Sequence, residues 1–164
     1  MTEPPINVLF LCTHNSARSV LAEALLNHIG KGRFCGFSAG SHPRCSVNPL
    51  SLQVLTEAVI ATDGLHSKSW DEFGRPDAER MDLVIAVCDN AAGEVCPYWP
   101  GLPATAHWGY PDPSAVEGSD KDRLTAFRQT LLQMRKRLEL LIDLPPPALE
   151  RVALQDAARR LAKQ

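Results

Sequence analysis

The sequence lacks any C-x-x-C pair, although it contains five cysteines among its 164 residues. An odd number of scattered cysteines does not suit a disulfide framework, and without paired C-x-x-C motifs we expect no structural zinc site. The five histidines are also scattered, without the spacing of metal ligands. We therefore expect free thiols and a location in the reducing cytoplasm, where disulfides are rare.

The chain also has no long apolar run and no strong excess of charge. No stretch approaches the roughly 20 apolar residues that a helix needs to cross a bilayer. The N-terminal residues lack the basic start of a signal peptide. A formal net charge of −2 predicts neither a nucleic-acid partner nor a membrane partner.

What the sequence does contain is a series of buried strands that alternate with helices. We expect strands over 6–11, 34–39, 83–87 and 104–107, and helices over 17–29, 49–61, 70–73, 119–142 and from about 148. The start signals are Asn48-Pro49 and Ser119, and Gly30 is the expected C-terminal cap of the first helix. This order favours a single α/β domain with an open four-stranded parallel sheet flanked by helices.

The stretch from Val8 to Ser19 carries the clearest chemistry. An apolar strand ends at Cys12, a short polar loop follows, and Arg18 opens a helix. A helix N-terminus with converging N–H groups binds anions, and a guanidinium suits a tetrahedral oxyanion. The same field should lower the pKa of Cys12 and make it a thiolate. Because Cys88 also follows a strand, we expect it at the same edge of the sheet.

Beyond this stretch, Asp112-Pro113 lies far down the chain, and Cys88 and Cys96 stand eight positions apart in a polar segment. Together with Cys12-x5-Arg18, this arrangement resembles the low-molecular-weight protein tyrosine phosphatases, and more closely the three-cysteine arsenate reductases built on that fold. The resemblance covers about residues 6–143 and leaves 148–164 as a C-terminal helical extension. It implies an oxyanion-binding loop of Thr13, His14, Asn15, Ser16, Ala17, Arg18 and Ser19.

The resemblance implies reduction of arsenate to arsenite in arsenic detoxification. Cys12 would attack arsenic, Asp112 would protonate the leaving hydroxide, and Arg18 would hold the other oxygens. Cys88 would then attack Cys12, and Cys96 would carry the disulfide outward to an external thiol reductant. Thioredoxin is favoured over glutaredoxin with glutathione, no tightly bound cofactor is implied, and phosphate or sulfate would compete for the loop.

Two further expectations concern the surroundings of the loop. Asn15, Glu23 and Ser38 match part of the potassium site of some relatives, but nearby Lys68 could supply the cation instead. In a helix, the spacing of Cys88 and Cys96 would separate their Cα atoms by roughly 12 Å, at about 1.5 Å per residue. A disulfide needs roughly 7 Å, so we expect segment 89–100 to be mobile.

Two other functions remain open at this point. A phosphatase would use Cys12, Arg18 and Asp112 alone, although Ser114-Ala115 stand where tyrosine phosphatases typically carry aromatic residues. A non-catalytic oxyanion-binding or redox-sensing module would bind the anion without turnover. We expect Cys35 to be structural and assign no role to Cys45.

Overall fold

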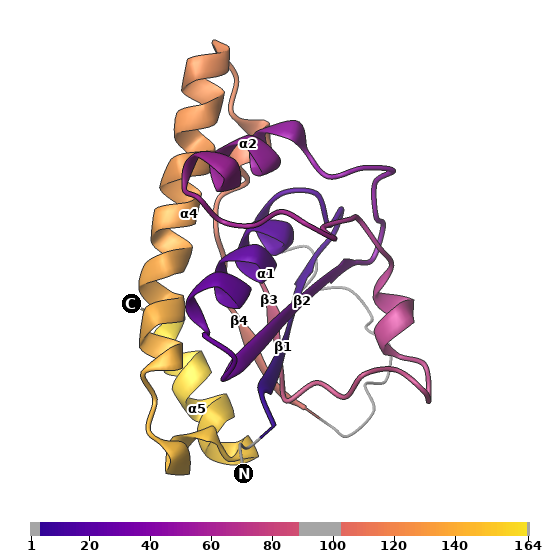
Figure 1. Cartoon of the computed structure of the whole chain (residues 1–164), viewed down its shortest axis with the longest axis vertical. Helices are drawn as coiled ribbons and strands as arrows, with labels where there is room; N and C mark the ends of the chain where they lie inside the picture. Colours follow the sequence, from indigo (N-terminus) through magenta and orange to yellow (C-terminus); the bar gives the residue numbers. More distant parts are fainter. Residues whose placement is uncertain (1–3, 89–102, 164) are drawn as a thin grey trace.

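The computed structural model describes residues 4–88 and 103–163, and these form one sheet covered by helices (Figure 1). The strands are β1 (Ile6–Cys12), β2 (Phe34–Gly40), β3 (Leu83–Ala86) and β4 (Ala104–His107). All neighbouring strands pair in parallel, in the order β2-β1-β3-β4. The predicted open four-stranded parallel sheet is therefore confirmed.

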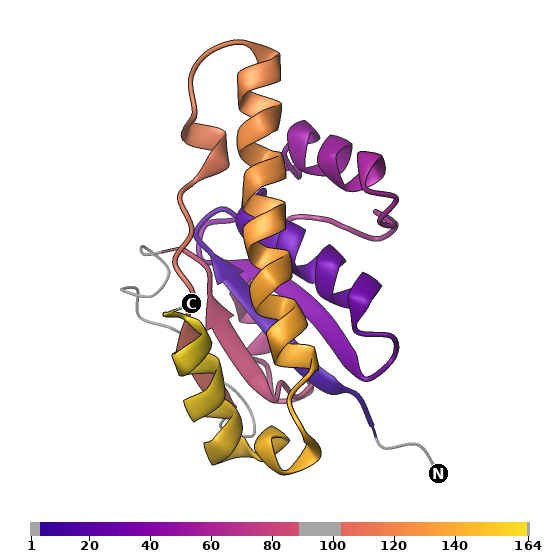
Figure 2. The same ribbon diagram turned by 90° about the vertical axis from the view of Figure 1, so that its left-hand side faces the viewer.

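The longer helices are α1 (Arg18–Ile29), α2 (Pro49–Glu57), α4 (Asp120–Ile142) and α5 (Arg151–Leu161). Short 3₁₀ segments are η1 (Trp70–Phe73), η2 (Pro113–Ala115) and η3 (Pro146–Leu149). Figure 2 shows α1, α4 and α5 side by side over one face of the sheet. The segment around η1 lies on the other side (Figure 1).

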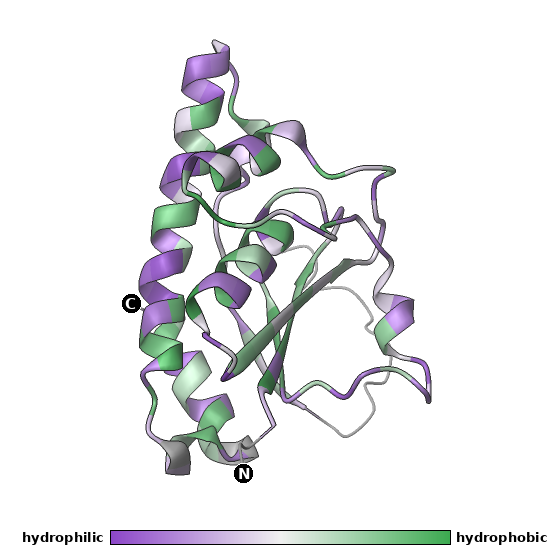
Figure 3. Ribbon diagram, in the orientation of Figure 1, coloured by the Kyte–Doolittle hydropathy of each residue, from purple (hydrophilic) through white to green (hydrophobic). Residues whose placement is uncertain are grey.

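Apolar side chains hold these layers together. β1 and β3 are mainly hydrophobic, whereas α4 carries both hydrophobic and hydrophilic residues (Figure 3). The predicted stripe on α4 is buried and comprises Leu124, Phe127, Leu131, Met134, Leu138 and Leu141. A helix with one apolar stripe packs that stripe against the sheet and leaves the opposite face to water.

Local sequence signals explain where the helices begin. The side chain of Asn48 accepts a hydrogen bond from the N–H of Leu50 at 2.9 Å, one residue beyond Pro49. Ser119 and Asp122 form a reciprocal capping box at the start of α4. Both helix starts predicted from the sequence are confirmed, because each depends only on contacts within one turn.

Helix ends differ more from the expectations. Helix α2 ends at Glu57 rather than near residue 61, because Val59 takes a left-handed φ of 60° and turns the chain. Gly30 does cap α1, but with a helical φ of −71°. The left-handed conformations that follow belong to Lys31 and Gly32, at 49° and 80°.

The first strand occupies the position that matters for function. β1 lies between β2 and β3, so the chain leaves β1 toward one side and returns on the other. In open α/β sheets, ligands bind beyond the carboxyl ends of the strands at such a switch point. Cys12 is the last residue of β1 and therefore lies at this point.

In the part of the chain that the structure describes, no helix combines the length and apolar character that a membrane crossing requires. The division into residues 6–143 and an extension at 148–164 stays a prediction.

Candidate active site

The loop between Cys12 and Arg18 is a tight cradle built against the end of β2. Cys12 pairs with Gly40 in the sheet register. A Cβ added to Gly40 would lie 2.6 Å from the carbonyl oxygen of Thr13 and 2.9 Å from that of Cys12. Only glycine permits this approach. Asn15 adopts a left-handed φ of 48°, a conformation that asparagine tolerates better than most residues.

Three backbone carbonyls of the loop accept hydrogen bonds from the segment that follows β2. The donors come from the next segment: His42 N–H to Thr13 O (2.8 Å), Arg44 N–H to His14 O (3.0 Å) and Asn48 N–H to Ser16 O (3.0 Å). In a planar trans peptide the N–H points opposite to the C=O. The N–H groups of His14, Asn15 and Ala17 therefore face the interior of the loop, as an oxyanion site requires.

Side chains also fix the loop. The amide of Asn15 donates to Ser19 Oγ at 2.8 Å, and its Oδ1 accepts from the backbone N–H of Lys68 at 2.9 Å. Ser51 Oγ donates to the carbonyl of Ser16 at 3.0 Å. Asn15, Ser16 and Ser19 are all buried. These polar groups are paired within the protein and give the loop a defined shape.

Arg18 and Asp112 come together from distant parts of the chain. Arg18 Nη2 lies 3.7 Å from Asp112 Oδ2, and Nη1 donates to the backbone carbonyl of Tyr110 at 2.9 Å. Asp112 Oδ1 accepts from the N–H and the hydroxyl of Ser114, at 2.9 and 2.7 Å. Ser114 therefore orients the carboxyl group and leaves Oδ2 toward Arg18, where a departing group would need a proton.

Cys88 lies directly beside the loop and is only 2% exposed. Its sulfur is 3.7 Å from Thr13 Oγ1, and it lies close enough to Cys12, which is 5% exposed, to raise the pKa of that thiol. The described cysteines Cys12, Cys35, Cys45 and Cys88 form no disulfide with one another. Two buried thiols thus meet at the same edge of the sheet, as their positions after β1 and β3 predicted.

The expectation of a low pKa at Cys12 is wrong for this structure. The hydrogen bond with Cys88 raises the pKa of Cys12 most, and burial raises it further. The positive charge of Arg18 and the N–H of Thr13 act in the opposite direction without prevailing. The sequence pattern identified the groups that lower the pKa but could not reveal the buried second thiol in contact with Cys12.

The residues matched to a potassium site do not fit a bound ion, because a lysine ammonium occupies their centre. Lys68 Nζ lies 3.6 Å from Glu23 Oε1 and donates to the carbonyls of Ser38 and His66, at 3.0 and 2.9 Å. Ser38 Oγ donates to the same oxygen of Glu23 at 2.6 Å. Lys68 also fixes Asn15 through its backbone N–H. The cation beside the loop is thus part of the chain.

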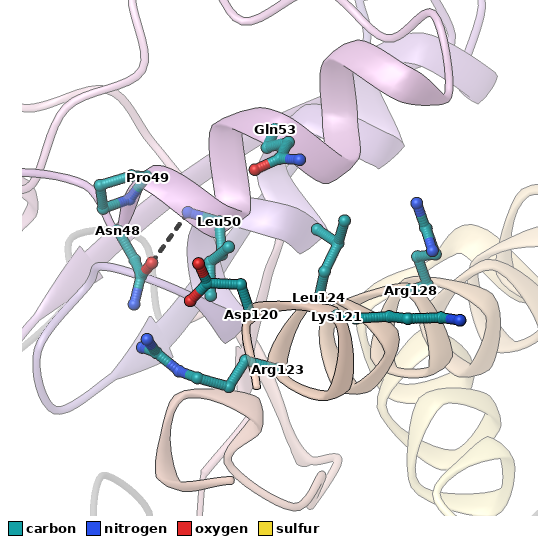
Figure 4. Close-up of a pocket in the computed structure, with 9 residues that line it drawn as sticks. All are labelled: Asn48, Pro49, Leu50, Gln53, Asp120, Lys121, Arg123, Leu124 and Arg128. Atoms are coloured by element: carbon teal, nitrogen blue, oxygen red, sulfur yellow. Dashed lines mark hydrogen bonds between the residues drawn. The ribbon is translucent and has the colours of Figure 1, made fainter. Parts of the chain in front are cut away.

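Some expected features lie elsewhere. Cys96 and segment 89–100 fall outside the described residues. The other predicted site residues lie on or beside the loop. A groove of about 630 Å³ between α2 and the first turns of α4 contains none of the reactive side chains (Figure 4). Among the described residues, no group of three His, Cys, Asp or Glu side chains could hold a metal ion.

The sequence did not reveal the two contacts that bring residues 108–112, the segment that carries Asp112, to Arg18. The carbonyl of Tyr110 carries no side-chain signal, so its hydrogen bond to Arg18 could not be anticipated. Arg137 lies over the rings of Tyr110 and Trp108, at 4.8 and 6.0 Å from their centroids. Its only sequence signal is a charged residue next to Leu138 in the buried stripe of α4.

Comparison with known proteins places these features in a family. Residues 7–153 match the model of the low molecular weight phosphotyrosine protein phosphatases. An arsenate reductase of Halalkalibacterium halodurans is 31% identical over 132 residues, which is 80% of this chain and 91% of that protein.

Solved structures agree. An arsenate reductase in its phosphate-binding state is 28% identical with a TM-score of 0.64, over 84% of this chain and 96% of the other. A thioredoxin-dependent arsenate reductase of Corynebacterium glutamicum is 26% identical with a TM-score of 0.56, over 85% of this chain. This chain spans 65% of the length of that structure.

Proposed function

The chain belongs to the low molecular weight phosphotyrosine protein phosphatase family, and on that premise we propose that it reduces arsenate to arsenite in arsenic detoxification. The observation that carries the proposal is the second buried thiol, Cys88, in contact with Cys12. Hydrolysis of a phosphate ester needs one nucleophilic sulfur, whereas reduction of arsenic needs a second sulfur to receive the bond.

In the first step, arsenate lies in the loop with its oxygens held by the inward N–H groups and Arg18. Cys12 must lose its proton for attack, and an oxygen of the bound arsenate dianion is a base within reach. The sulfur then forms a bond to arsenic, and one As–O bond breaks. Asp112 Oδ2 donates a proton to the departing hydroxide, which leaves as water. The product is an arsenic(V) thioester on Cys12.

In the second step, Cys88 attacks the sulfur of Cys12. The S–S bond forms, the S–As bond breaks, and its electron pair remains on arsenic, which is thereby reduced from As(V) to As(III). The thiol proton of Cys88 is released as it attacks. Arsenite leaves, and the chain holds a Cys12–Cys88 disulfide.

Regeneration requires an external thiol. Because both sulfurs of the first disulfide are buried, a partner protein cannot reach them. We assign Cys96 to attack Cys88 and to carry the disulfide to an accessible position. The C. glutamicum neighbour is thioredoxin-dependent, so thioredoxin is the proposed reductant, ahead of glutaredoxin with glutathione. The electrons come from thiols, so the reaction requires no tightly bound cofactor, and the cytoplasm supplies the reducing conditions.

A phosphatase that uses Cys12, Arg18 and Asp112 would share the first step. It leaves Cys88 without a role, and η2 presents Ser114 and Ala115 rather than an aromatic surface for a phenyl ring. An oxyanion-binding module without turnover leaves the orientation of Asp112 by Ser114 without a role. The phosphatase does not account for the pair of thiols, and a non-catalytic oxyanion-binding or redox-sensing module does not account for the orientation of Asp112.

The test compares the wild type with Cys88→Ser and a matched control, Cys35→Ser on β2. Arsenite is measured with thioredoxin, thioredoxin reductase and NADPH, and hydrolysis of an aryl phosphate is measured in parallel. We expect Cys88→Ser to abolish arsenite production and retain any slow phosphatase activity, while Cys35→Ser keeps both. Full arsenate reduction by Cys88→Ser would overturn the proposal.

A further inference from the structure

Helix α5 forms hydrogen bonds with β4, an edge strand of the sheet. The backbone N–H groups of Ala104 and Trp108 donate toward β3, so the backbone N–H and C=O of Thr105 point away from β3 toward the open edge. Gln155 Oε1 accepts from the N–H of Thr105 at 3.1 Å, and Arg159 Nε donates to its carbonyl at 3.0 Å. Side chains of α5 thus supply the hydrogen bonds that a fifth strand would have made.

The same helix holds the residue that leads from β4 to the active site. Trp108 is 1% exposed, and its indole N–H donates to the carbonyl of Ala158 at 2.8 Å. Leu154 and Ala158 of α5 are also fully buried. Figure 2 shows α5 lying along the edge of the sheet beside α4. Trp108 therefore fixes the start of the segment that leads to Asp112.

Arg137 of α4 is the second anchor. Its Nη2 donates to the carbonyl of Ala162 at 3.2 Å, just beyond the end of α5. Its guanidinium lies 4.8 Å from the ring centroid of Tyr110 and 6.0 Å from that of Trp108. Burial raises the pKa of Tyr110, and the charge of Arg137 opposes that rise, as expected for a cation close to the phenol.

The segment that Trp108 and Arg137 hold contacts Arg18 and carries Asp112. Tyr110 is buried, and its carbonyl accepts from Arg18 at 2.9 Å. Asp112 follows two residues later, with Oδ2 at 3.7 Å from Arg18. Residues 108–112 lie between β4 and η2, in neither strand nor helix, so their position depends on these side-chain contacts. A displacement there moves both the acid and the acceptor that orients Arg18.

We propose that α5 and Arg137 form a brace that positions residues 108–112, and through the Tyr110 carbonyl aims Arg18 at the oxyanion. Arg137 and Trp108 are then positioning residues, since neither touches the reacting atoms. The effect on turnover rests on the proposed arsenate reduction, whereas the effect on oxyanion binding requires only that Arg18 holds an anion. Misplacement of a catalytic group by a fraction of an ångström is enough to lower the rate substantially.

The test uses the full chain with Arg137→Gln, Arg137→Lys and Trp108→Phe. Arg135→Gln is the matched control, because Arg135 lies on the same helix, is 46% exposed and forms an ion pair with Glu139 one turn away. The dissociation constant of inorganic phosphate is measured by calorimetry, and kcat and KM for arsenate by the coupled assay. All measurements are made well below the melting temperature of each variant, where a loss of global stability leaves the affinity of the folded protein unchanged.

We expect Arg137→Gln to weaken phosphate binding and to lower kcat, each about tenfold. Trp108→Phe should act in the same direction, because it retains the ring but loses the bond to Ala158. Arg137→Lys keeps the charge without the planar fork and should recover part of the loss. Arg135→Gln should stay within about twofold, as for other exposed ion pairs.

The proposal is overturned if folded Arg137→Gln and Trp108→Phe bind phosphate and turn over like the wild type, or if Arg135→Gln loses as much. If Arg137→Gln does not fold, Trp108→Phe and Arg137→Lys decide by the same criteria. A wild type that binds phosphate without reducing arsenate would contradict the proposed function alone, since the phosphate affinities still test the brace.

Discussion

Replacement of Lys68 by methionine removes the cation beside the oxyanion loop and keeps the length of the side chain. The ammonium lies 3.6 Å from Glu23 Oε1, and the two side chains are 10% and 15% exposed. It also donates to the carbonyls of Ser38 and His66. In Lys68→Met, the carboxylate of Glu23 keeps the hydrogen bond from Ser38 but loses its countercharge.

The magnitude follows from this burial. Breaking a buried ion pair by removing one partner costs about 3–5 kcal/mol. Because both side chains retain some contact with water, we expect the lower end, about 3 kcal/mol of unfolding free energy. In a domain of this size, 1 kcal/mol corresponds to about 2–4 °C, so the melting temperature of Lys68→Met should fall by roughly 6–12 °C.

Thermal unfolding followed by circular dichroism measures this loss, with Lys136→Met on the exposed face of α4 as the control. A loss below about 1 kcal/mol, or an equal loss in Lys136→Met, would refute the reasoning.

Three further predictions concern the loop. Cys88→Ala removes the largest cause of the raised pKa of Cys12, so alkylation of Cys12, followed by mass spectrometry, should begin at lower pH than in the wild type; an unchanged onset would count against the contact. Asp112→Asn should lower kcat by about 10²–10⁴ with little change in phosphate affinity, and an unchanged kcat would exclude the acid role. Gly40→Ala places a Cβ at 2.6 Å from the carbonyl of Thr13, so stability should fall by about 1–3 kcal/mol and phosphate binding should weaken; a wild-type melt would contradict this.

Local signals in the sequence were sufficient for most of the fold. Asn48-Pro49 and the Ser119–Asp122 box act within one turn, and they mark the starts of α2 and α4 in the structure. The central strands β1 and β3 were recognisable because both faces of a central parallel strand are covered, which requires continuous apolar runs. The position of Cys12 beyond β1 then followed from the topology.

Contacts between residues that are distant in the sequence could not be predicted. Helix α2 ends at Glu57, two residues before the exposed Val59, which takes a left-handed φ where the sequence offers no glycine. The pKa of Cys12 depends on Cys88, which is brought beside it only by the pairing of β1 with β3. The hydrogen bond from Arg18 to Tyr110 uses a backbone carbonyl, which every residue has. Such contacts have no pattern along the chain.

The relay of sulfur bonds is tested most directly by a single turnover of Cys96→Ser with arsenate and no external reductant. The variant retains Cys12 and Cys88 but cannot pass the disulfide onward. We expect one arsenite per chain and a Cys12–Cys88 disulfide, identified by peptide mass mapping. Arsenite released while both thiols remain free, or no disulfide between these two residues, would contradict it.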